Sequence, residues 1–544
     1  LAHYTGAHIC QCLSRLSTLQ PHSTVVIDGS RRLTREQFVR GVLSLAHGLR
    51  QLGLKSGDVV AIAALNRGLY LEWLLAVTLV GGIAAPLNYR WNFEEARSAL
   101  ENVDPIMLVT DESCGHWLSE IIKNPVLHIQ WHVLMSAQSD LNQRGNVLTT
   151  GTLKIPLVTS LSFICSWAPE SVALICFTSG TTGRPKGVKI SHSALIVQSQ
   201  AKINIVGYHG DDIYLHTAPL CHIGGLSSVM AMLMVGGCHV FLTKFEAKLT
   251  VDAIEEHSVT SLITVPAIMN DLISEIRMKE GWRCDNSLKK ILNGGGSLSA
   301  DLINDATKYF PQAKILSAYG MTETCSSLTF MTLYDPRLDD GEAKPTSVQQ
   351  QEGVCVGKPA PCVELRIDVE KQSDVGRILT KGPHVMVGYW GLKLEGWFDT
   401  GDVGKIDDCG NLWLMGRADG RIKSGGENVY PEEVEAVLSQ NPGISSSVVV
   451  GVPDARLTEM VVACCRLKDK WEWRDDPWAV TREMCLSSEI LCRYCKEKNL
   501  TGYKVPRSFV VWRRPFPLTV NGKLRRNRVR SEVLTLLRSL PSSL

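Results

Sequence analysis

The sequence has little net charge, no internal repeat and no low-complexity tract. Its 57 basic and 55 acidic side chains leave a formal net charge of +2, which is too small a surplus to concentrate nucleic acid or anionic lipid. Apolar residues make up 44% and charged residues 21%, so a largely disordered or collagen-like chain is excluded as well. The densest basic run, Arg525, Arg526, Arg528 and Arg530, is interpreted as a solvated helix face, and we expect no nucleic-acid partner.

An uninterrupted apolar run of membrane length is also missing. The best candidate, residues 223–242, is uncharged but is interrupted by Gly224, Gly225, Gly236, Gly237 and His239. These breaks predict a buried helix followed by a short strand that starts at Cys238, rather than a transmembrane segment.

The 17 cysteines do not form the frame of a small disulfide-rich domain. They are scattered from Cys10 to Cys495 along 544 residues, so reduced thiols are expected. Cys492 and Cys495 make one CxxC, but no second pair or histidine cluster follows at metal-ligand spacing. Packing within a helix therefore explains this pair better than a zinc or redox site.

Targeting signals in the sequence are weak. The chain begins at Leu1 without Met, and its first residues match neither a secretory signal peptide nor clearly a transit peptide, which leaves open a truncated N-terminus. The last three residues, Ser542, Ser543 and Leu544, resemble the peroxisomal Ser-Lys-Leu address with the basic residue replaced. A frayed polar tail is the alternative.

The order of the predicted elements indicates an α/β fold. Helix patterns over residues 34–52 and 70–80 alternate with short apolar runs, and the chain is too long for one hydrophobic core. Further apolar runs start at Val172, Ser261 and Lys314. We therefore expect a large N-terminal body of layered α/β sheets, in which helices cover parallel strands.

The pattern changes after the polar loop predicted at residues 334–352. The short runs VELRID, GRILTKG and GNLWLMG predict a small antiparallel or distorted barrel-like unit that completes the body. A boundary near Arg417 divides the chain into domains 1–417 and 418–544. The second is predicted to be a small α+β domain, with a helix from Pro431 that stops at Gly443 and flanking strands SSVVVGV and MVVACCRL.

The most informative segment is ICFTSGTTGRPKGVKISH, which starts at Ile175. An apolar strand enters a loop of glycines and hydroxyls, and such a loop with a lysine can surround polyphosphate oxygens. The spacing GxxGxxKG is not that of a Walker A loop, so a P-loop NTPase is excluded; a flexible surface turn is the alternative. The candidate phosphate-binding residues are Thr178, Ser179, Gly180, Thr181, Thr182, Gly183 and Lys186.

Three later segments carry further candidate groups. In SAYGMTETCSS, Tyr319 offers a ring to stack on a base and Glu323 offers a hard oxygen ligand for Mg²⁺. In GWFDTGDVG, Asp402 can accept both ribose hydroxyls, although DTGD alone would be only a turn. In PLTVNGK, Lys523 is a flexible positive charge that would ordinarily be solvated.

These segments, in this order between Phe177 and Lys523, resemble the adenylate-forming superfamily of acyl-CoA synthetases, luciferases and adenylation domains. The resemblance implies an acid–thiol ligase that uses ATP, Mg²⁺ and coenzyme A, with an N-terminal AMP-binding domain and a mobile C-terminal domain. It also implies that Tyr319 lies along adenine, that Thr322 contacts the α-phosphate, and that Glu323 and Thr181 hold the metal. The other nucleotide-contacting positions implied are Gly294, Gly295, Gly296, Ser317, Gly320, Met321, Asp402 and Arg417.

The resemblance assigns the C-terminal domain a role in both half-reactions. Lys523 is implied as the catalytic lysine of adenylate formation, with Lys186 beside the phosphates. Asp419 matches the hinge position, where Gly420 replaces a common acidic residue. After the domain rotates, the pantetheine of coenzyme A would meet Lys423, Ser424, Gly425 and Gly426.

The acid pocket is assigned to the segment APLCHIGGLSS. His222 takes the position of a gating aromatic or histidine side chain with a catalytic role, although a buried structural histidine is the alternative. Gly224 and Gly225 are expected to leave space for a ring, with Leu226 and Ser227 beside them.

The strings HIGGLSS, SLITVPAIM, ILNGGGSLS and AYGMTETCSSLTFMTL most resemble the plant 2-succinylbenzoate (o-succinylbenzoate):CoA ligases. That family forms 2-succinylbenzoyl-CoA in phylloquinone (vitamin K1) biosynthesis, which implies an aromatic carboxylic acid as substrate and a peroxisomal or chloroplast location. Alternatives are a 4-coumarate-like or fatty acyl-CoA ligase, of which the former usually has GEICIRG where this chain has GRILTKG, and a catalytically silent acyl- or nucleotide-binding protein. The sequence does not address the oligomeric state.

Overall fold

The computed structural model divides into two compact units. Among the described residues, the first unit lies within 8–178 and 185–415, and the second comprises Ser179 and residues within 416–539. It describes residues 8–123, 128–136, 147–156, 171–179, 185–282, 287–338, 349–350, 353–369, 374–417, 420–474, 484–517 and 524–539. The polar loop predicted at residues 334–352 therefore falls largely outside the described residues.

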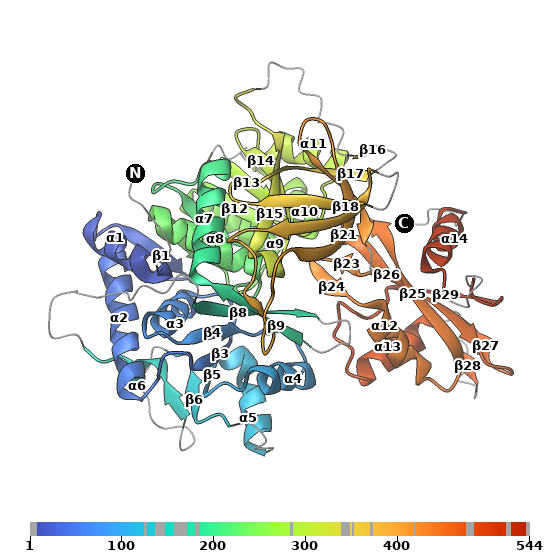
Figure 1. Ribbon diagram of the computed structural model, residues 1–544, viewed down its shortest axis with the longest axis horizontal. Helices are drawn as coiled ribbons and strands as arrows, with labels where there is room; N and C mark the ends of the chain where they lie inside the picture. The colour runs from blue at the N-terminus through green and yellow to red at the C-terminus, as the bar shows by residue number, and fades with distance from the viewer. Residues whose placement is uncertain are drawn as a thin grey trace. The chain divides into compact units, whose positions relative to one another are not determined.

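Two sheets form the frame of the first unit (Figure 1). The smaller has eight strands among the described residues, and its central strands are parallel, as predicted. Their order is β20 (Gly388–Tyr389), β9 (Pro185–Ser191), β8 (Val172–Ser179), β4 (Ile83–Pro86), β3 (Val59–Ala63), β5 (Met107–Thr110), β6 (Trp131–Leu134) and β7 (Val147–Thr149).

The larger sheet is parallel in one part and antiparallel in the other. The parallel part runs through β14 (Lys314–Met321), β13 (Lys290–Asn293), β12 (Ser261–Thr264), β10 (Ile213–His216), β11 (Cys238–Phe241) and β1 (Thr24–Asp28), with β2 (Arg31–Thr34) antiparallel at its edge. The other part contains β15 (Ser326–Tyr334), β17 (Gly353–Pro359), β16 (Gln349–Gln350), β22 (Leu412–Arg417), β21 (Phe398–Ile406), β19 (Gly376–Lys381) and β18 (Glu364–Val369). The predicted antiparallel unit is confirmed, and β17 joins it to the large sheet by pairing with β15.

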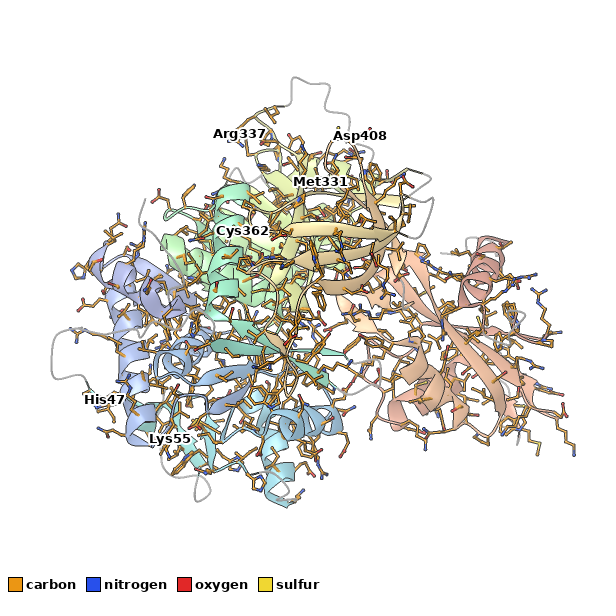
Figure 2. All side chains as sticks on the ribbon, viewed as in Figure 1. His47, Lys55, Met331, Arg337, Cys362 and Asp408 are labelled. Atoms are coloured by element: carbon orange, nitrogen blue, oxygen red, sulfur yellow. The ribbon has the colours of Figure 1, made fainter. Side chains whose placement is uncertain are left out.

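Helices surround the sheets, and their termini follow local sequence signals. In α2 (Arg35–Gln51) the Thr34 side chain accepts from the backbone N–H of Gln37 while the Gln37 side chain accepts from Thr34, which is a capping box. His47 lies on the outer side of this helix (Figure 2). The remaining helices of the unit are α1 (Cys12–Thr18), α3 (Gly68–Leu79), α4 (Phe93–Val103), α5 (Gly115–Lys123), α6 (Thr150–Leu153), α7 (His192–Lys202), α8 (Ile223–Val235), α9 (Ala247–His257), α10 (Pro266–Met278) and α11 (Ala300–Tyr309).

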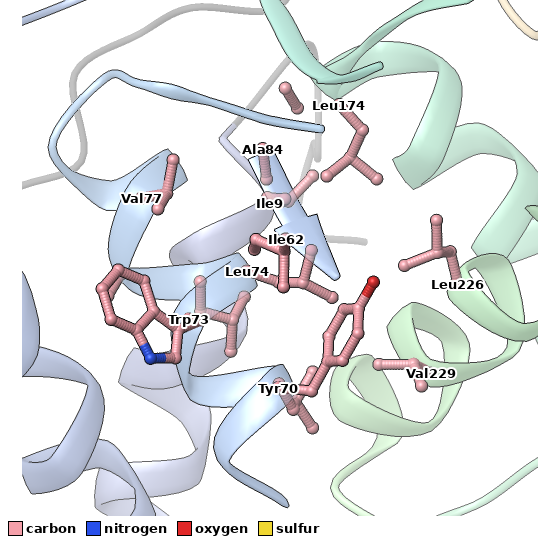
Figure 3. Packing of buried hydrophobic residues seen from close by; sticks show 14 of the residues in the cluster. Ile9, Ile62, Tyr70, Trp73, Leu74, Val77, Ala84, Leu174, Leu226 and Val229 are labelled. Atoms are coloured by element: carbon pink, nitrogen blue, oxygen red, sulfur yellow. The ribbon is translucent and has the colours of Figure 1, made fainter. Parts of the chain in front are cut away.

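The apolar run at residues 223–242 forms the predicted buried helix and short strand. Helix α8 ends at Gly236, whose φ of 81° is a conformation that glycine adopts without strain, and β11 follows. Side chains of α8, α3 and β3, including Leu226, Tyr70 and Ile62, pack in one buried cluster (Figure 3). Within the described ranges no helix combines the length and apolar character that crossing a membrane requires.

The second unit is a small α+β structure. A five-stranded sheet is formed by β24 (Glu427–Val429), β23 (Ile422–Ser424), β26 (Thr458–Leu467) and β25 (Ile444–Asp454), with β29 (Ser508–Val511) parallel to β26. The other elements are α12 (Pro431–Ser439), α13 (Ser488–Glu497), α14 (Arg526–Ser539) and the short pair β27 (Glu472–Trp473) and β28 (Cys485–Leu486). Cys495 is buried on α13, which confirms helical packing for that cysteine.

Two details of this unit differ from prediction. The helix from Pro431 ends at Ser439 rather than at Gly443, because Pro442 disfavours the helical conformation at the residue before it. The arginine run does not form one solvated face. Arg526 donates to Glu435 and to the Val449 carbonyl, and Arg530 donates to Glu459 (2.9 Å) and to the Gly451 carbonyl (2.7 Å). These two arginines attach α14 to the sheet.

Candidate active site

A cation, an aromatic ring and a carboxylate come together where β9, β20 and the end of β14 meet. The Tyr389 hydroxyl donates to Glu323 Oε1 at 3.1 Å, and Lys186 Nζ lies 5.4 Å from the centroid of the Tyr389 ring. Antiparallel pairing of β20 with β9 brings Tyr389 opposite Val188. Tyr389 was not predicted as a site residue because it is far from both partners in sequence.

The turn that follows Glu323 is tightly constrained. Cys325 and Ser326 have φ values of 52° and 107°, which are unfavourable for residues other than glycine. Gln198 on α7 compensates by donating to the carbonyls of Ser327 (2.7 Å) and Thr324 (3.3 Å). At Gly320, a Cβ atom would lie 1.6 Å from the Ser326 carbonyl oxygen, so no larger residue fits there.

Tyr319 and Asp402 form a second buried polar pair. The Tyr319 hydroxyl donates to Asp402 Oδ2 at 2.6 Å. Asp402 lies within strand β21, where its backbone N–H donates to Thr400 Oγ1 at 3.1 Å. DTGD is thus part of a strand rather than an exposed turn.

The glycine segment after β13 lies at the carboxyl edge of the parallel strands. Asn293 is paired in register with Ser317, so the NGGGS segment and the end of β14 are neighbours. Asn293 Nδ2 donates to the Gly296 carbonyl at 2.6 Å, and Gly295 has a φ of 70°. Ligands of open α/β sheets bind at such edges.

The predicted acid pocket lies at the first turn of α8. The loop before it is held by Asn66, whose side chain donates to the Ala218 carbonyl (2.9 Å) and accepts from the Leu220 N–H (2.8 Å). The space at Gly225 is filled by the Pro219 carbonyl, 2.5 Å from where a Cβ would stand, so this glycine serves close packing. At Gly224 a Cβ would meet only Ile263 Cδ1, at 3.7 Å, so this is the more open of the two glycines.

In the second unit, Lys423–Gly426 form a tight hairpin between β23 and β24. Gly425 and Gly426 have φ values of 59° and 86°, as a two-residue hairpin turn requires. The Gly425 N–H donates to the Leu457 carbonyl at 2.8 Å, and the Lys423 N–H donates to Glu459 Oε2 at 2.9 Å. The turn is therefore anchored to the rest of the second unit.

Several predicted site residues lie outside the described residues, and their assignments stay predictions. These are Gly180, Thr181, Thr182, Gly183, Asp419 and Lys523, together with the tripeptide Ser542–Leu544 and the side chains of Ser179 and Arg417.

Glu323 suits a nucleotide-bound Mg²⁺. No group of three or more His, Cys, Asp and Glu side chains gathers at metal-binding distance within the described ranges. Mg²⁺ at nucleotide sites is commonly held by one or two carboxylates, with phosphates and water completing its octahedron. A buried glutamate that a tyrosine hydroxyl orients fits that arrangement.

Comparison with known families adds an independent observation. Residues 14–390 match the family described as AMP-binding enzyme, and residues 433–523 match the AMP-binding enzyme C-terminal domain. The two matches together contain the predicted site residues from Thr178 to Lys523, apart from Asp402, Arg417, Asp419 and Lys423–Gly426, which fall between them.

Individual relatives are similar over the whole chain. The 2-succinylbenzoate–CoA ligase, chloroplastic/peroxisomal, of Arabidopsis thaliana is 53% identical over 564 aligned residues, which cover 100% of both chains. A double mutant of o-succinylbenzoate CoA synthetase from Bacillus subtilis, bound with its product analogue, matches with a TM-score of 0.73 at 25% identity, covering 96% of this chain and 98% of that chain. A structure of that synthetase with ATP and magnesium ion matches with a TM-score of 0.63 at 26% identity, covering 95% and 98%.

Proposed function

Because the chain belongs to the AMP-binding enzyme family, we propose that it is a 2-succinylbenzoate:CoA ligase that uses ATP and forms 2-succinylbenzoyl-CoA through an acyl-adenylate. The observation that carries the substrate is the 53% identity to the Arabidopsis ligase over the full length of both chains. The position of this reaction in phylloquinone biosynthesis remains the prediction made from the resemblance.

The chemistry needs two steps because a carboxylate is a poor electrophile. In the first, a substrate carboxylate oxygen attacks the α-phosphorus of ATP, and pyrophosphate leaves. In the second, the thiolate of coenzyme A attacks the carbonyl carbon of the acyl-adenylate, and AMP leaves. The protein's main task in the first step is to stabilise the negative charge that gathers around the phosphates.

We assign that task to Lys186 and to a Mg²⁺ ion that Glu323 would hold, with Tyr389 positioning both side chains. The Tyr389 ring lies under the Lys186 ammonium, and its hydroxyl fixes the Glu323 carboxylate. When bound, Mg²⁺ would supply positive charge against the phosphate oxygens, with Glu323 and Thr181 as its proposed protein ligands. Thr322 and the backbone of Gly294–Gly296 complete the proposed phosphate and nucleotide contacts.

Asp402 and Tyr319 are assigned to the nucleoside. The 2.6 Å hydrogen bond from Tyr319 orients the Asp402 carboxylate, which is proposed to accept the ribose hydroxyls. The same bond restrains the tyrosine ring, which is proposed to lie along adenine. One buried pair thus serves both parts of the nucleoside.

The second unit is proposed to be mobile and to supply Lys523 in the first step, stabilising the charge at the α-phosphate. Asp419 is the proposed hinge. In the second step, the anchored turn at Lys423–Gly426 is proposed to face the pantetheine of coenzyme A. His222 is proposed to gate the acid pocket between the two steps.

A location in the chloroplast, the peroxisome or both is proposed as well. Its support is the chloroplastic/peroxisomal designation of the Arabidopsis relative. Import assays with fluorescent fusions of the full chain, with and without Ser542–Leu544, test the peroxisomal part.

Thioester formation from 2-succinylbenzoate, ATP, Mg²⁺ and coenzyme A tests the proposed function, with 4-coumarate and a medium-chain fatty acid as parallel substrates. We expect 2-succinylbenzoate to be preferred and the product to vanish in Lys523→Ala. Preference for another acid would reassign the substrate and leave the two-step chemistry in place. Turnover of none of the acids would favour a silent binding protein.

A further inference from the structure

Lys202, the last residue of α7, has an ionisable side chain that is fully buried. It is among the largest fully buried side chains, and its ammonium donates to the hydroxyls of Ser227 (2.5 Å) and Ser228 (3.2 Å). Among the described residues no carboxylate forms an ion pair with it. The chain then continues in a π-helical turn, Ile203–Gly207, a rare geometry that is frequent at functional sites.

Two other lysines with little exposure are paired with a carboxylate. Lys290, which is half-buried, donates to Asp212 Oδ2 at 2.6 Å, and Lys504, which is buried in the second unit, donates to Glu433 Oε1 at 2.8 Å. A buried ammonium that has only neutral partners is strongly disfavoured, because hydroxyls replace water poorly around a charge. Burial accordingly lowers the pKa of Lys202 to about 7.

The Lys202 ammonium points at the turn assigned to the acid pocket. Helices α7 and α8 pack side by side (Figure 1). The hydroxyls of Ser227 and Ser228 both donate to the carbonyl of Gly224, at 3.4 and 2.8 Å. The ammonium is therefore two hydrogen bonds away from the more open glycine of the pocket.

Two buried tyrosines lie beside the same serines. Tyr208 and Tyr214 have their rings 5.9 Å apart. Burial raises the pKa of the Tyr214 phenol, an effect that the neighbouring Ser228 partly opposes.

We propose that Lys202 binds the second carboxylate of the substrate, the one that does not become the thioester, and thereby selects aromatic acids with two carboxylates. The proposal rests on the proposed function, since 2-succinylbenzoate has a carboxylate on the ring in addition to the one that becomes the thioester. It extends that function by naming the residue that rejects monocarboxylates.

The physical basis of this selectivity is the missing countercharge. A carboxylate that reaches Lys202 accepts from its ammonium and forms a buried, hydrogen-bonded ion pair. An acid without that group leaves the ammonium with its neutral partners only. Loss of one partner from a buried charge pair typically changes binding by about 30- to 5,000-fold.

The test compares Lys202→Met with wild type on two acids, 2-succinylbenzoate and 4-oxo-4-phenylbutanoate, which lacks only the ring carboxylate. We expect kcat/KM for 2-succinylbenzoate to fall about 100-fold in the variant, while the value for 4-oxo-4-phenylbutanoate stays within about threefold. Lys308→Met removes an exposed lysine of the same unit and should change neither value. A 2-succinylbenzoate-dependent rise in Tm should be present in wild type and absent in Lys202→Met.

Other results would overturn the proposal in distinguishable ways. If Lys202→Met keeps the preference for two carboxylates, or loses activity on both acids equally, Lys202 does not bind the substrate while the proposed function stands. If wild type itself does not use 2-succinylbenzoate, the proposed function fails first. Loss of the fold in both Lys202→Met and Lys202→Gln would identify a structural lysine and also contradict the proposal.

Discussion

Two parts of the first unit differ in how their charged side chains are paired. The proposed nucleotide region contains Tyr319, Glu323, Tyr389 and Asp402, and the proposed acid region contains Lys202, Ser227 and Ser228. In the nucleotide region, Asp402 and Glu323 each receive a tyrosine hydroxyl from the protein itself. In the acid region, Lys202 has two serine hydroxyls and no described carboxylate. We infer from the contrast that the protein itself orients the side chains proposed to bind the nucleotide. Lys202, which is proposed to recognise the acid, would receive its carboxylate partner from the substrate.

The largest expected effect is a loss of kcat/KM on substitution of Glu323, which changes the nucleotide region and leaves the acid region intact. Glu323→Gln removes the proposed metal ligand, so kcat/KM should fall about 100- to 1,000-fold with every acid tested. Pyrophosphate release at increasing Mg²⁺ concentration measures it. A loss that differed between acids would mean that Glu323 takes part in acid selection, and the contrast between the two regions would be wrong.

A substitution at Gly320, in the same region, should lower the free energy of unfolding. Gly320→Ala would place a Cβ 1.6 Å from the Ser326 carbonyl, so the strands must separate, at a cost of more than about 3 kcal/mol. Gly294→Ala is the matched control, because no atom lies within 4 Å of its would-be Cβ. Urea unfolding of the two variants checks the difference, and equal stability would contradict the constraint on this turn.

The acid region should respond to pH in a way that the nucleotide region does not. The pKa of Lys202 is about 7 in the folded protein against 10.5 for an ordinary lysine, so between these values the unfolded chain binds a proton that the folded one lacks. Stability from this site therefore rises with pH across that window, by up to about 1.4 kcal/mol per pH unit. Lys202→Met should be more stable than wild type near pH 7, with the advantage shrinking towards pH 10. Unfolding at pH 7.5 and 9 measures the change, and a constant difference would contradict the lowered pKa of Lys202.

The smallest expected effect tests how Glu323 is positioned. Tyr389→Phe keeps a ring beneath Lys186 but removes the hydrogen bond to Glu323, which should cost about 1.5 kcal/mol, roughly a tenfold rise in KM for ATP–Mg²⁺. Tyr389→Leu removes the ring as well and should cost more. Equal effects of both substitutions would show that the hydroxyl alone matters.

Local patterns predicted much of the fold. The helix at residues 34–52 and the strands from Val172 and Lys314 were predicted because the spacing of apolar residues is a local signal. The end of α12 was misplaced because a glycine was weighed above Pro442, and the roles of Arg526 and Arg530 were missed because Glu435 and Glu459 lie far away in the sequence.

Site residues could be predicted from the sequence only where they lie in a recognisable motif. Glu323 and Asp402 lie in recognisable strings, whereas Tyr389, Gln198 and Asn66 act through partners that only the fold brings near. Lys202 has no motif at all. Its one sequence signal is a lysine at the end of an otherwise uncharged helix, which an exposed helix end would explain equally well.

Direct competition among acids tests the central claim most sharply. Equal concentrations of 2-succinylbenzoate, 4-oxo-4-phenylbutanoate, 4-coumarate and a medium-chain fatty acid would be incubated with the full chain, ATP, Mg²⁺ and limiting coenzyme A, and the thioesters counted by mass spectrometry. The account predicts that 2-succinylbenzoyl-CoA dominates in wild type and loses that lead in Lys202→Met. Dominance of any other thioester in wild type would contradict it.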